Sequence, residues 1–366
     1  MKSKLINKIK TNKRLRSNLI TFGMVVFAYI LMEILMAVGV VSSLLKGLLV
    51  PLCIYAILAV SLNLTVGILG ELSLGHAGFM CVGAFSGAFF SKCMQDTIPI
   101  AGVRFTLALL IGALCAGLFG FLIGIPVLRL KGDYLAIVTL AFGEIIKNII
   151  NILYVGIDEN GFHFSTKSSL ELNLSENGKI IIQGAQGITG TPNDSTFTIG
   201  ILLLLITLII VLNLINSRDG RAIMAIRDNT IAAESVGINI TKYKLMAFSI
   251  SAALAGVAGV LYAHNLSTLT ALPKNFGYNM SIMILVFVVL GGIGNIRGSV
   301  IAAVILTLLP ELLRGLNDYR MLIYAVVLIV MMLFNWAPAC IKWREKMTYK
   351  IKSRFSPKKI KDGKEA

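Results

Sequence analysis

Long apolar stretches separated by short polar connections run along most of the chain. A transmembrane helix needs about 20 predominantly apolar residues to cross the hydrocarbon core of a bilayer. The pattern therefore predicts an all-α integral membrane protein, a polytopic helical bundle of about ten spans whose transmembrane domain covers residues 19–338. The expected spans lie near residues 19–41, 47–68, 77–91, 104–128, 134–154, 197–216, 245–264, 280–293, 299–313 and 321–338.

The composition supports this interpretation. Hydrophobic residues make up 56% of the 366, charged residues only 14%, and the mean hydropathy is +0.83. A soluble globular chain of this length would not be so apolar. The first apolar stretch is too long for the core of a typical signal peptide, so we interpret it as an uncleaved span.

The distribution of positive charge sets the expected orientation. The formal net charge is +16, and positive residues concentrate in two tails, residues 1–18 and 339–366. Basic segments beside apolar helices are typical of the cytoplasmic side. We therefore expect both termini in the cytoplasm, which agrees with an even number of spans. Nucleic acid is not an expected partner, because the tails contain no recognisable binding module.

The sequence offers little for catalysis or cofactor binding. The five cysteines form no CxxC pair, the three histidines are scattered, and no GxxxxGK[ST] motif for nucleotide phosphates occurs. No clustered His, Asp or Ser/Lys constellation suited to chemistry is present either. We therefore expect no metal site, no cofactor held by this chain and no enzyme activity.

Two windows are poor helices because glycines interrupt them. Residues 66–78 contain four glycines and three polar groups between apolar flanks, and residues 290–298 repeat this character. Irregular backbone at membrane depth is tolerated only where it is buried in protein or lines a watery cavity. In transporters, paired interrupted segments point toward the substrate path. Ordinary turns between helices are the alternative, and His76 suits either a structural hydrogen bond or a proton relay.

Glu144 and Lys147 are two opposite charges within one predicted span. Three positions apart on a helix, they lie close enough to pair, which reduces the cost of placing both in the membrane. The pair is a candidate for function or a structural bridge, and spacing alone is consistent with both.

Two longer polar segments interrupt the apolar pattern. Residues 155–196 form the expected outer loop, which carries more acidic than basic residues, and loops of this length usually act as a lid or a docking surface. Residues 217–244 are basic and are expected in the cytoplasm. Within them, Asp228 or Asn229 can cap a short helix that ends at Gly237. Such a helix either lies in the groove of a partner or belongs to a solvated loop.

This short cytoplasmic helix resembles the EAA loop of ABC importer permeases. In that loop two alanines, three variable residues and a glycine mark the helix that docks on the ATPase subunit, and Ala232, Ala233 and Gly237 fill these places. Ile231 stands at the position of the motif's glutamate, and the acid occurs instead at Glu234. The resemblance implies that these five residues couple the chain to an ATPase.

A wider set of motifs resembles the branched-chain amino acid permeases. The stretches SLNL at 61–64, SLGHA at 73–77, LKGDYLAIVTL at 130–140 and GGIG at 291–294 carry this resemblance, which covers about residues 47–335. The third stretch and the long outer loop favour a LivM-like member of the family over a LivH-like one. Irregularity and resemblance together imply a translocation path or gate formed by Asn63, Ser73, Gly75, His76, Gly291, Gly294 and Asn295.

The resemblance implies a subunit rather than a complete transporter. The expected role is one half of the translocation channel of an ATP-driven importer for leucine, isoleucine, valine or a related small substrate, in the cytoplasmic membrane of a bacterium. The expected partners are a homologous LivH-like permease, two ATP-binding cassette subunits that bind ATP and Mg²⁺, an extracytoplasmic substrate-binding protein and the lipid bilayer. The alternative is an ion-coupled secondary carrier of a small polar solute.

Overall fold

The computed structural model describes residues 13–39, 41–130, 132–158, 161–175 and 178–336. The chain divides into two compact units, residues 1–305 and 306–366, and each is considered by itself. Most of the two basic tails predicted from the sequence lies outside the described residues.

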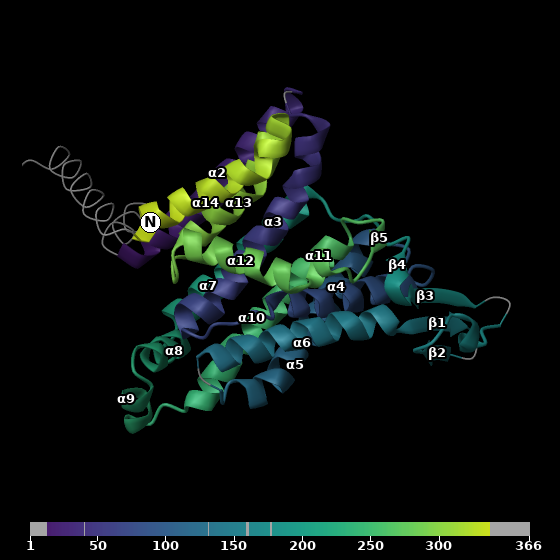
Figure 1. Ribbon diagram of the computed structural model, residues 1–366, viewed down its shortest axis with the longest axis horizontal. Helices are drawn as coiled ribbons and strands as arrows, with labels where there is room; N and C mark the ends of the chain where they lie inside the picture. Colours follow the sequence, from purple (N-terminus) through teal and green to yellow (C-terminus); the bar gives the residue numbers. More distant parts are fainter. Residues whose placement is uncertain (1–12, 40, 131, 159–160, 176–177, 337–366) are drawn as a thin grey trace, which may run out of the picture. The chain divides into compact units, whose positions relative to one another are not determined.

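Helices dominate the described part of the chain, as expected where apolar segments must satisfy their backbone hydrogen bonds internally. The helices are α2 (Lys13–Ala37), α3 (Ser43–Asn63), the π-helix η1 (Leu64–Leu69), α4 (His76–Cys93), α5 (Ala101–Val127), α6 (Asp133–Ile152), α7 (Phe197–Asn216), α8 (Arg218–Asp228), α9 (Thr230–Ser235), α10 (Ile240–Ala263), α11 (Pro273–Phe276), α12 (Tyr278–Gly291), α13 (Ile296–Leu312), the 3₁₀ turn η4 (Leu313–Tyr319) and α14 (Arg320–Trp336) (Figure 1).

Eight segments within the described residues are long and apolar enough to cross a membrane. They lie at 18–37, 43–69, 101–127, 133–152, 197–216, 240–263, 273–291 and 296–315. The other two predicted spans correspond to α4 and α14, which are not among these eight. The structure therefore shows a helical membrane protein, whereas the count of about ten spans and the side of the termini stay predictions.

The core of the first unit forms where helices with small residues approach closely. A methyl group added at Gly83 of α4 would lie 2.3 Å from the Cα of Gly256 in α10, and one at Gly259 would lie 2.1 Å from the carbonyl oxygen of Met80. Such contacts let backbones pack where lipid supplies no hydrophobic drive. In contrast, α5 exposes large apolar side chains such as Leu114, which is 72% exposed and suits a lipid-facing surface.

The expected outer loop is not helical, so the all-α prediction is wrong for this segment. Its strands are β1 (Tyr154–Asp158), β2 (Gly161–Ser165) and β3 (Lys179–Gln183), which form an antiparallel sheet in the order β2-β1-β3, and β4 (Ile188–Thr189), which pairs with β5 (Thr268–Leu269). Two 3₁₀ turns, η2 (Leu170–Leu172) and η3 (Gly184–Gln186), connect them. The runs GFHFS and KIIIQ favour strands because aromatic and β-branched residues have high strand propensity.

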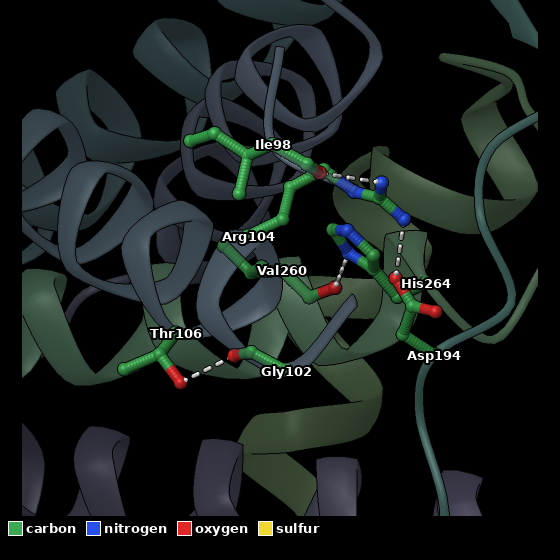
Figure 2. A network of polar contacts seen from close by, with 7 residues as sticks. All are labelled: Ile98, Gly102, Arg104, Thr106, Asp194, Val260 and His264. Atoms are coloured by element: carbon green, nitrogen blue, oxygen red, sulfur yellow. Dashed lines mark hydrogen bonds and ion pairs between the residues drawn. The ribbon is translucent and has the colours of Figure 1, made fainter. Parts of the chain in front are cut away.

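A buried polar network fastens the end of this outer segment to the helices (Figure 2). The guanidinium of Arg104, at the start of α5, lies 3.4 Å from the carboxylate of Asp194 and donates to the carbonyl oxygen of Ile98 at 3.2 Å. His264, directly after α10, makes its 3.0 Å contact through Nδ1 to the carbonyl oxygen of Val260. Arg104 is 6% exposed, so Asp194 supplies the countercharge that a buried cation requires.

The outer sheet and the polar cytoplasmic helices lie at opposite ends of the first unit. Figure 1 shows β1, β2 and β3 at one end of its long axis, and α8 and α9 far from them toward the other end. The assignment of residues 155–196 and 217–244 to opposite sides of a membrane stays a prediction.

Candidate functional site

The cytoplasmic segment folds into two short helices with defined caps. Ser217 caps α8 by accepting a hydrogen bond from Gly220 N at 3.0 Å, and Asn229 caps α9 by accepting from Ala232 N at 3.0 Å. Gly237 then adopts a left-handed conformation with φ +85°, which a side chain would strain. Asn229 rather than Asp228 is therefore the cap, and the predicted stop at Gly237 is present.

The surface of α9 is apolar where the EAA motif has an acid. Ile231 is 81% exposed and Val236 is 75% exposed, whereas Ala233 is only 3% exposed. Ala232, Glu234 and Gly237 are exposed. Four of the five residues expected to couple to an ATPase are thus accessible. The fifth, Ala233, is buried and packs α9 against the rest of this chain.

The cytoplasmic helix α8 packs against the first glycine-interrupted segment. Ile223 of α8 is fully buried in a cluster with Leu64, Ile68 and Leu69 of η1 and with Ala247 of α10. This apolar contact joins the cytoplasmic segment directly to the π-helix, which sequence patterns alone did not predict.

Two polar contacts reinforce this junction. Arg227, at the end of α8, donates a hydrogen bond from Nη1 to the carbonyl oxygen of Gly67 at 3.0 Å. Lys244 of α10 forms a mostly buried ion pair with Glu71, two residues beyond η1. Sequence analysis noted Arg227 and Lys244 only as part of a basic segment, because Gly67 and Glu71, which they contact here, are far away in the chain.

The two glycine-interrupted segments meet in the structure. A methyl group added at Gly67 would lie 2.3 Å from Gly294 N, so the two backbones are in direct contact. Asn63 joins them as well, because its Oδ1 accepts from Gly294 N at 2.8 Å and its Nδ2 donates to the hydroxyl of Ser299 at 2.7 Å. The structure thus brings together Asn63 and Gly294, which are 231 positions apart.

Gly291 and Asn295 complete the turn between α12 and α13. Gly291 packs so closely on Gly298 that a methyl group at Gly298 would lie 1.7 Å from the carbonyl oxygen of Gly291. Asn295 accepts a hydrogen bond from Gly298 N at 3.3 Å through its side chain. Gly292 and Gly294 have φ values of +94° and +79°, so this turn needs glycine for its backbone conformation.

Ser73, Gly75 and His76 lie apart from this contact, at the start of α4. A methyl group at Gly75 would lie 2.2 Å from the carbonyl oxygen of Thr139 in α6, so the backbone packs against α6 there. Ser73 is 1% exposed and its hydroxyl has no hydrogen-bond partner among the described residues.

The buried ring of His76 has a hydrogen bond to Ser61. Its Nε2 lies 2.7 Å from Ser61 Oγ, and the Ser61 hydroxyl donates to the carbonyl oxygen of Leu58 at 2.9 Å. Because a hydroxyl has one proton to donate, His76 Nε2 carries the hydrogen of the first bond. His76 is only 2% exposed, so its ring has no access to water. This geometry suits a structural hydrogen bond better than a proton relay.

A polar cavity of about 420 Å³ opens beside the meeting point of the interrupted segments. Its polar lining comes from Asn18 and Thr21 of α2, Asn216 at the end of α7, and Asn295 and Arg297 after α12. Ile68 and Gly294 also line it. Pockets of this size with a few convergent polar groups are typical of small-molecule sites.

Glu144 and Lys147 form the intramembrane ion pair expected from their spacing. Lys147 is 5% exposed, and Glu144 Oε1 also accepts a hydrogen bond from Tyr278 N at 2.8 Å. The carboxylate therefore bridges α6 to the start of α12, which is consistent with the structural alternative. The described residues contain no group of three or more His, Cys, Asp or Glu side chains placed to hold a metal ion.

Comparisons with known proteins agree with the motifs. A family model described as branched-chain amino acid transport system / permease component matches residues 43–334. The high-affinity branched-chain amino acid transport system permease protein LivM of Salmonella typhimurium (strain LT2) is 36% identical over 309 residues, which cover 82% of this chain and 70% of that protein. The protein of the same name from Escherichia coli (strain K12) is 36% identical over 294 residues, covering 78% of this chain and 67% of that protein.

A second permease of the same kind is more distant. The LivH permease protein of Salmonella typhimurium is 23% identical over 283 residues, which cover 76% of this chain and 88% of that protein. No solved structure matches the chain. The higher identity to LivM supports the choice made from the LKGDYLAIVTL stretch.

Proposed function

The chain belongs to the branched-chain amino acid transport permease family, and on that premise we propose that it is the LivM-like permease subunit of an ATP-driven importer. It forms half of a translocation path through the bacterial cytoplasmic membrane. The family consists of transport permeases rather than enzymes, so ATP and Mg²⁺ belong to two partner ATPase subunits. The remaining partners are a LivH-like permease and an extracytoplasmic substrate-binding protein.

The observation that carries the proposal is the capped helix α9 on the cytoplasmic segment. Ile231 and Val236 are 81% and 75% exposed, so two large apolar side chains lie close together on and beside α9 and are free to contact a partner. The ATPase therefore receives α9 through apolar contacts at Ile231 and Val236, and Glu234 is the acid beside them.

Leucine, isoleucine and valine are the proposed substrates because the similar permeases are described as branched-chain amino acid transport proteins. Related small substrates are compatible with the same fold. The polar cavity beside Gly294 and Asn295 forms part of the inner end of the path, and the contact of Gly67 with Gly294 acts as its constriction. Substrate enters from the side of the outer sheet, where the binding protein docks.

Reconstitution tests the proposed function. The chain is co-expressed with its partner permease and ATPases, placed in proteoliposomes, and supplied with binding protein and labelled leucine. We expect uptake that requires ATP, the binding protein and all subunits. Uptake of leucine by this chain alone, driven by an ion gradient, would instead establish the secondary carrier and refute the importer.

Docking of α9 is tested by co-purification with the ATPase. Ile231→Arg changes an exposed side chain and should reduce the amount of bound ATPase at least about tenfold, as for a residue at the centre of an interface. Leu170→Arg is the matched control, because Leu170 is 87% exposed but lies in the outer segment. Equal ATPase recovery with both variants would show that α9 does not dock there. Ala233 is unsuitable for this test, since a charge at this buried position would disturb the fold.

A further inference from the structure

The end of the π-helix η1 depends on a side chain from the cytoplasmic segment. Gly67 lies in the last turn of η1, where backbone carbonyls lack partners within the helix. Arg227 Nη1 supplies the missing donor at 3.0 Å, and a cation at a helix C-terminus is also favoured by the helix dipole. The contact spans 160 positions of sequence.

The stem of Arg227 packs directly against the backbone at Gly70. Gly70 has φ +82°, and a methyl group there would lie 2.5 Å from Arg227 Cγ. The stem of the arginine therefore occupies the space that a side chain at position 70 would need. The other guanidinium nitrogens, Nε and Nη2, donate to Asp228 at 3.0 and 2.8 Å, which holds the planar group in its orientation.

The far side of Gly67 touches the second interrupted segment. Gly294 N is bonded to Asn63 at 2.8 Å, and any residue larger than glycine at position 67 would collide with it. Ile68 and Gly294 both line the polar cavity. One unbroken series of contacts thus runs from the end of α8, through Arg227 and Gly67, to the wall of the cavity.

A second contact holds the same segment from α10. Glu71, just beyond η1, pairs with Lys244. Residues 67 and 71 are therefore held by Arg227 at the end of the cytoplasmic helix α8 and by Lys244 near the start of α10, so that the end of η1 is tied directly to the cytoplasmic segment.

We propose that Arg227 is the positioning residue that transmits movement of the ATPase-docking segment to η1, and thereby opens and closes the contact between Gly67 and Gly294. This inference rests on the proposed function. The fork of donors on arginine is essential, because one group must bind Asp228 and the Gly67 carbonyl together. A lysine has a single nitrogen on a flexible stem and cannot hold both partners in this geometry.

The test compares ATP hydrolysis with leucine uptake in the assembled complex in proteoliposomes. Arg227→Lys keeps the charge but should lower uptake about tenfold, since a hydrogen bond from a charged group is worth about that factor. ATP hydrolysis stimulated by the binding protein should stay within about twofold of the unmodified complex, because α9 still docks. The number of ATP molecules used per leucine therefore rises.

Two further variants separate this role from a structural one. Arg221→Lys is the matched control, because Arg221 is on the same helix but is exposed, and its side chain donates one long hydrogen bond, to the carbonyl oxygen of Asn216 at 3.4 Å. This variant should leave the ratio of ATP molecules hydrolysed to leucine molecules taken up unchanged. Gly70→Ala disturbs the same contact from the other side and should raise the ratio as Arg227→Lys does.

The outcomes distinguish this inference from the proposed function. An unmodified complex without ATP-dependent uptake overturns both. If that complex transports normally but Arg227→Lys and Gly70→Ala leave the ratio unchanged, only the role of Arg227 is wrong. Equal losses of uptake, ATP hydrolysis and assembled complex in both variants would likewise overturn it, since they would show that Arg227 only holds the fold together.

Discussion

Replacing Gly67 with alanine should force apart the two glycine-interrupted segments. The added methyl group would lie 1.9 Å from Asn63 Oδ1, 2.3 Å from Gly294 N and 2.7 Å from Gly294 Cα. Two of these three atoms belong to backbone, which cannot turn aside as the end of a flexible side chain can. The contact between η1 and the turn after α12 is therefore expected to open.

The size of the effect follows from two losses. Overpacking of a tight contact costs about 1–3 kcal/mol. Separation also removes the hydrogen bond between Asn63 and Gly294, which contributes about 1 kcal/mol. Alanine is the better helix former and offsets up to about 1 kcal/mol, so the net loss in the free energy of unfolding is about 1–4 kcal/mol.

Unfolding of the purified chain by SDS, followed by circular dichroism, measures this loss. Gly47→Ala is the matched control, because Gly47 lies in the same continuous helical segment and no atom comes within 4 Å of its added methyl group. That variant should be as stable as the unmodified chain or more stable by up to about 1 kcal/mol. If Gly67→Ala unfolds at the same SDS concentration as Gly47→Ala, the segments do not pack as described.

Three other changes test the charged contacts. Asp194→Ala leaves a buried guanidinium without its carboxylate and should cost about 1–3 kcal/mol in the same unfolding assay; a stability unchanged from that of the unmodified chain would show that the network in Figure 2 contributes nothing. Lys147→Met alone leaves the Glu144 carboxylate unpaired and should be less stable than the double variant Lys147→Met with Glu144→Gln; the reverse order would contradict a buried pair. The hydrogen bond from Lys179 lowers the pKa of the exposed Asp96 carboxyl below its ordinary value, so the contact is present above about pH 4 and is lost as the pH falls through the lower folded-state pKa. We therefore compare hydrogen exchange at residues 94–97 in the unmodified chain with that in Asp96→Asn at each pH. The ratio of the two exchange rates should increase at acid pH, and a ratio that does not change with pH would refute the contact.

Local patterns in the sequence were sufficient to predict the short helix α9 of the cytoplasmic segment, but not α8 before it. Asn229 has a side chain that caps the start of a helix, and Gly237 suits the end of one, so a short helix between them was predicted, and α9 lies there. The pair formed by Glu144 and Lys147 was predicted for the same reason, because three positions on one helix define their distance.

Contacts between distant segments could not be predicted in this way. The glycines at 67 and 294 were recognised as helix breakers, but nothing in their spacing indicates that they touch. The strands of the outer loop were missed because the segment was interpreted from its charge and length rather than from the short runs GFHFS and KIIIQ. Arg227 and Lys244 were seen only as members of a basic segment.

The sequence by itself determined that this chain enters a membrane, which permease family it belongs to, and where its helices are interrupted, because hydropathy, motifs and glycine positions are properties of neighbouring residues. Only the tertiary structure decided that Ala233 faces inward while Ile231 faces outward, that His76 bonds to Ser61, and that Arg227 reaches the carbonyl of Gly67. Those results depend on which helices pack together, and helix packing depends on contacts summed over the whole chain. The link between the cytoplasmic segment and the interrupted helices belongs to this second kind of information.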